Sequence, residues 1–215
     1  NIALSSHAAL LKTALEQNHR LEHLDVSSTS LADNDLASLL EPLWTNSTLT
    51  HLDISGNGAL TNETARNLGD MLMQNSGIQT LLLDGLHGIT KDKLAKRLAV
   101  ALRVNSSVHH LSMVRANTEI AGITALAEAL TVNHAIQQLN LSQNPLNDEA
   151  ISILVKNLKN NFGVHSLWLE HCKFGDSAVK AIVPWLKTTT VLTKQFHISH
   201  NKISEGSNAF LQEAI

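Results

Sequence analysis

The chain has 215 residues, of which 43% are hydrophobic and 16% charged, and its formal net charge at pH 7 is −3. Its 16 Lys and Arg residues are scattered, so they form no basic patch for nucleic acid, and four Phe and three Trp without a Tyr leave few rings on which single-stranded bases could stack. No run of apolar residues reaches the roughly eighteen that a membrane-spanning helix needs.

The sequence holds one cysteine, Cys172, which cannot form a disulfide within the chain. Because extracellular repeat domains usually protect their ends with disulfide-bonded caps, this favours the cytoplasm or another reducing compartment. The chain starts at Asn1 and ends at Ile215 inside a helical pattern, and no polar terminal cap is visible. We therefore expect one continuous, monomeric domain over residues 1–215 that is a fragment of a longer protein.

After residues 1–20, which are predicted as an amino-terminal helix, one sequence frame returns seven times. In each copy three aliphatic residues have the spacing of Leu49, Leu52 and Ile54, and in most copies an Asn stands three positions before the first of them. Successive asparagines are 28, 29, 30, 28 and 28 residues apart, a period typical of a stacked solenoid. The copies begin near residues 21, 49, 78, 108, 136, 164 and 192.

In the first part of each copy, apolar residues stand at every second position, which is typical of a strand with one buried face. In the second part they have the spacing of a helix. Acidic, Asn and Thr residues stand where the helices should start, among them Asp33, Asp92 and Asp176. In the last copy Thr189 replaces the Asn and one extra residue precedes Phe196, so its strand register is left open. The predicted helices span residues 34–45, 62–74, 91–104, 120–132, 147–160, 176–188 and 205–215.

A single copy cannot fold alone. It buries about six large apolar side chains at roughly 1.5–3 kcal/mol each, against roughly 1–2 kcal/mol of backbone ordering for every residue. Stacking buries the aliphatic ridges of neighbouring copies against each other. We therefore predict an α/β fold: a right-handed solenoid arc of about seven repeats of 28–30 residues, with a parallel β-sheet on the concave side and α-helices on the convex side.

The pattern LxxLxLxxN, followed by an LxxxL helix and a closing Asn, resembles the ribonuclease-inhibitor-like class of leucine-rich repeats over essentially the whole chain. In that class the last Asn of LxxLxLxxN lies in the turn after the strand and bonds neighbouring backbone. The resemblance gives this role to Asn57, Asn144 and Asn201, with Cys172 as an accepted substitute. Positions that depart from the pattern imply irregular turns, and these are Thr29, Leu86 and Ala116.

Alternation along the strands sends every second side chain to the concave face. At the carboxy-terminal end this exposes Trp168, and a large ring beside charged neighbours is a favoured contact anchor, although the ring could instead lie flat against the next repeat. Trp44 and Trp185 are expected to pack locally. The predicted partner-binding residues are His23, Asp25, His51, Asp53, Leu82, Asp84, His110, Trp168, Glu170, His171 and His197.

The amino-terminal histidines and aspartates leave three interpretations open: plain solvated surface, a contact that responds to pH, or a chance divalent-metal site. The chain has no HExxH motif or pair of cysteines, so we predict no metal. GxSxG, Walker and GxGxxG motifs are also missing, and Cys172 occupies a turn-filling position. We predict neither enzyme activity nor a cofactor.

The leading hypothesis is a module that binds a protein partner on its concave face, since the resembling class mostly binds proteins and a preformed arc loses little entropy on docking. The composition is similar to that of repeat proteins that intracellular bacteria deliver into host cells, which would place the chain in the host cytosol. Two alternatives follow from the resemblance: GTPase activation like the Ran activator, with Arg115 at a strand end, and actin capping like tropomodulin.

Overall fold

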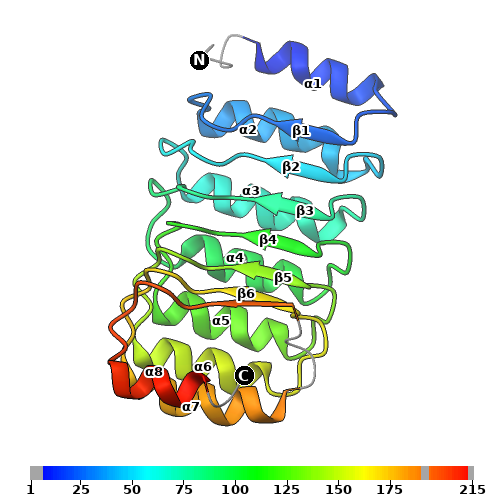
Figure 1. The fold of residues 1–215 in the computed structure, drawn as a ribbon. Helices are drawn as coiled ribbons and strands as arrows, with labels where there is room; N and C mark the ends of the chain where they lie inside the picture. Colours follow the sequence, from blue (N-terminus) through cyan, green and yellow to red (C-terminus); the bar gives the residue numbers. More distant parts are fainter. Residues whose placement is uncertain (1–6, 190–193, 213–215) are drawn as a thin grey trace.

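The computed structural model describes residues 7–189 and 194–212. Within these residues, seven strands form one parallel sheet in sequential order, and the helices stack along one face of that sheet (Figure 1). The chain thus climbs by one strand and one helical segment per repeat, from α1 at one end of the stack to α8 at the other. This confirms the predicted α/β repeat solenoid.

All seven strands are three residues long, and the middle residue of each points toward the helices. The register pairs equivalent residues of neighbouring repeats, such as Leu81 with Leu111. It also settles the last repeat, because Leu167 pairs with Phe196 and Trp168 with His197. The strands are β1 (His23–Asp25), β2 (His51–Asp53), β3 (Thr80–Leu82), β4 (His110–Ser112), β5 (Gln138–Asn140), β6 (Ser166–Trp168) and β7 (Gln195–His197).

The helices match the predicted ones, two of them to the residue and most others with ends one to three residues shorter. The predicted helix 34–45 divides into α2 and a 3-10 turn, since Pro42 has no N–H for an α-helical hydrogen bond. Predictions that reach residues 1–6, 192 or 213–215 lie partly outside the described residues. The helices are α1 (Ala8–Gln17), α2 (Asp33–Leu40), η2 (Glu41–Trp44), α3 (Asn62–Gln74), α4 (Lys93–Leu102), α5 (Ile120–Leu130), α6 (Asp148–Leu158), α7 (Asp176–Thr188) and α8 (Glu205–Gln212).

The core fills the space between the sheet and the helices. Leu52, Leu81, Leu111 and Leu139, the middle residues of four strands, are each at most 1% exposed and belong to one continuous apolar cluster. Each such side chain contributes roughly 1.5–3 kcal/mol by leaving water. The aliphatic frame read from the sequence is therefore the core of the protein.

The upstream asparagines form a ladder along the edge where the strands begin. In Asn133, Oδ1 accepts the backbone N–H groups of Ala135 and Ile136, while Nδ2 donates to the carbonyls of Leu102 and Asn105 in the preceding repeat. The same set of bonds recurs, so every rung satisfies buried backbone groups of two repeats. We call this set the asparagine ladder: Asn75, Asn105, Asn133 and Asn161.

The turn asparagines at the opposite edge also bond backbone, as the resemblance implied. Asn144 donates to the carbonyls of Leu141 and Met113, and its Oδ1 accepts N–H groups of Ala116 and Thr118. Asn57 makes the same set of bonds in its repeat, and Asn201 donates to two carbonyls and accepts the N–H of Cys172. The thiol of Cys172 contacts the carbonyl of Leu141 and replaces the amide in part.

The turns after the strands share one left-handed position in every repeat. Further left-handed residues follow at Ser30, Asn117 and Lys173, directly after Thr29, Ala116 and Cys172. The expected irregularity therefore occurs at Thr29 and Ala116, and also at Cys172, whereas after Leu86 the additional left-handed residue comes later, at Asp92. The shared position is Ser28, Gly56, Gly85, Arg115, Gln143, His171 and His200, with φ between 53° and 71°.

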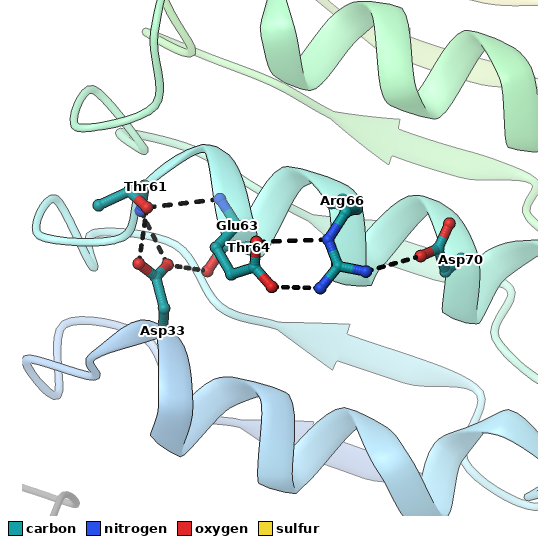
Figure 2. A network of polar contacts seen from close by, with 6 residues as sticks. All are labelled: Asp33, Thr61, Glu63, Thr64, Arg66 and Asp70. Carbon is teal, nitrogen blue, oxygen red and sulfur yellow. Dashed lines mark hydrogen bonds and ion pairs between the residues drawn. The ribbon is translucent and has the colours of Figure 1, made fainter.

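Aspartates stand at the helix starts, as the sequence predicts, and their carboxylates also hold the next repeat. Asp33 accepts the backbone N–H of Thr61 at 2.9 Å and the hydroxyl of Thr64 at 2.6 Å, both at the start of α3 (Figure 2). Burial opposes ionisation of Asp33, but these hydrogen bonds outweigh it and lower its pKa. Asp92, Asp148 and Asp176 reach forward in the same way. The helix ends are thus linked from repeat to repeat.

Candidate functional site

The face of the sheet opposite the helices carries the residues predicted to meet a partner. We call this the concave face, and its side chains come from the first and third residues of each strand. The register places eight of the predicted binding residues on it: His23, Asp25, His51, Asp53, Leu82, His110, Trp168 and His197. Nothing yet tests whether these residues bind, so that part stays a prediction.

The amino-terminal part of the concave face is a layer of imidazoles and carboxylates. The rings of His23 and His51 stack with centroids 5.1 Å apart, because they are paired residues of adjacent strands. Asp25 and Asp53 each accept the N–H of the serine two positions on, at 2.8 Å. For Asp25 this hydrogen bond with the Ser27 backbone is the main reason why its pKa is lowered. A carboxylate held ionised in this way does not fit the role of a general acid.

Towards the centre the surface becomes less polar. Leu82 is half-buried in the column that holds Asp53 one strand earlier. Asp84 lies just beyond it and accepts the Ser112 hydroxyl at 2.6 Å and the Val114 N–H at 2.8 Å. Burial lowers the pKa of His110, and His51 adds to that effect. Part of this polar set is therefore fixed by internal bonds and is not free for a partner.

The carboxy-terminal part of the concave face holds a stacked aromatic pair. The rings of Trp168 and His197 lie 5.8 Å apart at an angle of 12°. Trp168 is half-buried and His197 exposed, and both side chains belong to the column that has Asp25 at its start. Beside them, Glu170 accepts the Ser199 hydroxyl at 2.5 Å. The ring of Trp168 therefore packs on the next repeat and still presents surface, and its role as a contact anchor stays a prediction.

His171 lies just outside this face, in the turn after β6. Its ring stacks on that of His200 with centroids 4.2 Å apart and an angle of 10°. Nδ1 of His200 lies 3.0 Å from the Ser199 hydroxyl, which in turn donates to Glu170. Glu170, Ser199, His200 and His171 therefore form one polar chain from the concave face to the edge where the strands end.

Sequence reasoning singled out Arg115 and His171 at the edge formed by these turns but did not bring them together in one site. An open cavity there is lined by the five residues Arg115, Gln143, His171, Lys173 and His200, which we call the strand-end rim. All five have positive φ, and four of them occupy the left-handed position shared by every repeat. Four of the five recur at the same offset after their strands, but only the stacking of the repeats brings them together with Lys173 around one cavity.

Other features of the described residues bear on the sequence predictions. Trp185 is 6% exposed and meets Phe196 edge to face, which confirms local packing, whereas Trp44 is 43% exposed and is less packed than expected. Burial raises the pKa of the Cys172 thiol to about 12, which suits a structural residue. Residues 7–189 and 194–212 contain no group of three or more His, Cys, Asp or Glu side chains placed to hold a metal ion. None of the helices in these ranges is long and apolar enough to cross a membrane.

Comparisons with known proteins agree with this architecture. Residues 45–69 match a family model described as Leucine Rich repeat. No curated protein sequence matches the chain. Among solved structures, the tropomodulin C-terminal domain from Caenorhabditis elegans is similar, with a TM-score of 0.57 and 15% identity over 72% of this chain and 93% of that one.

Two further solved structures are also similar. A chain of the yeast Rad7 and Elc1 complex has a TM-score of 0.55 and 17% identity over 82% of this chain and 42% of that one. The Leiomodin-1 Actin-Binding Site 2 structure has a TM-score of 0.45 and 13% identity over 100% of this chain and 88% of that one. At such identities the tropomodulin and Rad7–Elc1 likenesses show the leucine-rich-repeat fold alone.

Proposed function

We propose that this chain is a protein-interaction module that docks its partner on the concave face. The observation that carries the proposal is the Trp168–His197 stack, a broad ring pair on a sheet face that no described helix covers. Tryptophan and its flat neighbours contribute large contact area at little cost in side-chain entropy. Glu170 beside the stack adds a charged group that can set the orientation of a partner.

The internal bonding of the repeats supports this use. The asparagine ladder and the forward-reaching aspartates hold successive repeats together, so the concave face is formed before any partner arrives. A preformed surface avoids part of the ordering entropy that binding otherwise costs. The similar Rad7–Elc1 structure is itself a complex of proteins, and the same kind of role is what we propose for this chain.

Affinity capture with matched tryptophan variants tests the proposal. The immobilised native chain, Trp168→Ala and Trp44→Ala are incubated with the same cell lysate, and retained proteins are quantified by mass spectrometry. Trp44 is the control because it is 43% exposed but belongs to η2, away from the concave face. We expect at least one protein to be lost at least about tenfold with Trp168→Ala and kept with Trp44→Ala, which corresponds to about 1.4 kcal/mol.

Unfolding of both variants by urea provides the folding control. Trp168 is half-buried, so its replacement should change the free energy of unfolding by about 1 kcal/mol or less. Capture that depends equally on both tryptophans, or on neither, contradicts docking through the concave face. A large loss of stability in Trp168→Ala would assign the ring to the core.

Narrower predictions from the sequence remain proposals with their own assays. Delivery into a host cell, and with it a place in the host cytosol, is tested by a translocation reporter. GTP hydrolysis by a panel of small GTPases with and without the chain tests activation like that of the Ran activator, and pyrene-actin assembly tests capping. None of these functions is favoured by a specific contact among the described residues, so binding to a protein is the function that we state.

A further inference from the structure

The strand-end rim is a concentration of free hydrogen-bond donors. Arg115 and Lys173 both line its cavity, and neither takes part in an ion pair with another described residue. Within the same residues, the side chain of Gln143 also forms no hydrogen bond. These groups supply two full positive charges and an amide at one place on a chain whose net charge is −3.

No carboxylate lines this cavity. Glu170 is the nearest acid along the polar chain to the rim, and its Oε1 already accepts the Ser199 hydroxyl at 2.5 Å. The stacked rings of His171 and His200 complete the lining and add nitrogen atoms that can form hydrogen bonds. The lining of the rim therefore carries the positive charges of Arg115 and Lys173 and no acidic side chain.

Several backbone N–H groups of the rim turns are already bonded within the protein. The N–H groups of Arg115, Gln143 and His171 donate to carbonyls of the next repeat, one residue before its own left-handed position: those of Ser142, Glu170 and Ser199. The N–H groups that follow, at Ala116 and Cys172, donate to the turn asparagines. At these positions the side chains, which project from left-handed positions repeated in neighbouring turns, are the groups left to meet an anion.

The cavity continues along the edge of the sheet. A second cavity shares Arg115 and Gln143 with the first and is further lined by His87, Asn117 and Pro145. It too has no carboxylate in its lining. The two together follow the turns of five consecutive repeats, from His87 to His200. A surface of this length fits an extended segment with several charges better than it fits one isolated anion.

We propose that the strand-end rim binds an acidic segment of the protein partner, one rich in Glu or Asp side chains. The inference rests on the proposed function, because it names the chemistry of part of the partner. Arg115 and Lys173 bind carboxylates from different repeats of the first cavity, and Gln143, from the repeat between theirs, adds a hydrogen-bond donor. The docked segment runs beside the concave face, so one partner can engage Trp168 and the rim together.

Titration with short peptides tests the inference without the natural partner. Fluorescein-labelled hexaglutamate, hexaglutamine and a glycine-serine peptide with one phosphoserine are titrated with the chain at low salt, and fluorescence anisotropy is measured. The test variant is Arg115→Gln with Lys173→Gln. Its control is Lys96→Gln with Arg97→Gln on α4, which removes the same charge from exposed residues on the helix face.

We expect hexaglutamate to bind the native chain and the α4 control, and to bind the rim variant roughly tenfold more weakly, the effect of losing two exposed ion pairs. Binding should weaken as salt is raised. In the native chain, the imidazole NMR signals of His171 and His200 should shift on addition of hexaglutamate, which tests the site even if a variant fails to fold.

Equal binding by the two variants, or unshifted imidazole signals, would overturn the inference. Binding of the phosphoserine peptide without hexaglutamate would overturn it in favour of a single phosphate. If hexaglutamate does not bind while capture of a partner still depends on Trp168, only the inference of an acidic segment is contradicted. If hexaglutamate binds the rim but capture of a partner does not depend on Trp168, the proposed docking on the concave face is contradicted instead.

Discussion

At the edge where the strands begin, the asparagine ladder repeats the same four hydrogen bonds from Asn75 to Asn161. At the edge where the strands end, the equivalent turn position changes from repeat to repeat and holds Asn57, Leu86, Ala116 or Cys172. Both edges must satisfy backbone groups that the short strands leave unpaired. The edge where the strands begin satisfies them with the same asparagine bonds in each repeat, whereas the edge where the strands end does so with different residues.

This difference separates folding from binding. A buried amide that serves two repeats cannot be changed without leaving several polar groups unpaired. The strand-end turns are held mainly by backbone bonds between repeats, so their side chains are free to differ, as Arg115, Gln143 and His171 do. We expect substitutions to have the largest effect on stability at the first edge and the largest effect on binding at the second.

The largest effect on stability is expected for Asn133→Ala. The change removes two acceptor bonds and two donor bonds of a side chain that is 5% exposed. Each unsatisfied buried group costs about 1–3 kcal/mol, and partial entry of water should leave a net loss of about 3 kcal/mol. Urea unfolding measures it. The control is Asn34→Ala on the exposed surface of α2, and its free energy of unfolding should stay within about 0.5 kcal/mol of the native chain. Equal losses of stability in the two variants would contradict a special role for the ladder.

A smaller effect is expected from exchanging glycine at the left-handed turn position. Gly56 has φ +71°, and a Cβ there would meet the Ser28 side chain. Gly56→Ala should therefore destabilise the chain by about 1–2 kcal/mol. His171→Gly, at the same position with φ 54°, should be neutral or stabilising by up to about 1 kcal/mol, because it releases strain. Thermal unfolding compares the two, and a stabilising Gly56→Ala would show that the turns are not under this constraint.

The smallest effect is a pH dependence at the helix starts. The lowered pKa of Asp33 means that its carboxylate stabilises the folded chain above the unfolded-state pKa, and that this contribution disappears as the pH falls through the lower folded-state value. Asp33→Asn keeps an acceptor but does not titrate. We expect it to cost about 1 kcal/mol at neutral pH and less below about pH 4. A difference between native and variant that does not change with pH would mean that Asp33 acts without its charge.

The sequence alone sufficed for the solenoid, because a period of 28 to 30 residues and the aliphatic frame leave one way to bury Leu52 and its equivalents. It also placed Trp168 on the face opposite the core, since alternation in a strand is strict, whereas the pairing of Trp168 with His197 came from the structure. The placement of the left-handed turns followed less directly. Their conformation depends on hydrogen bonds to the next repeat, as when Asn144 binds Ala116 and Thr118.

Two features could not be read from a single sequence. Asp33 looks like the start signal of its own helix, and only the stacking of repeats shows that its carboxylate reaches Thr61 and Thr64 in the next one. The strand-end rim is similar, since Arg115 and Lys173 are 58 positions apart and share a cavity only because the intervening repeats have a fixed rise. Patterns within one repeat of the sequence do not reveal the contacts between repeats.

Hydroxyl-radical footprinting of the chain with a captured partner tests the central claim most directly. Side-chain oxidation is compared with and without the partner at Trp168 and His197 on the concave face, and at Trp44 and His134 away from it. The account predicts that the partner protects Trp168 and His197 and leaves Trp44 and His134 as reactive as before. Protection of Trp44 or His134 with unchanged oxidation of Trp168 and His197 would contradict it.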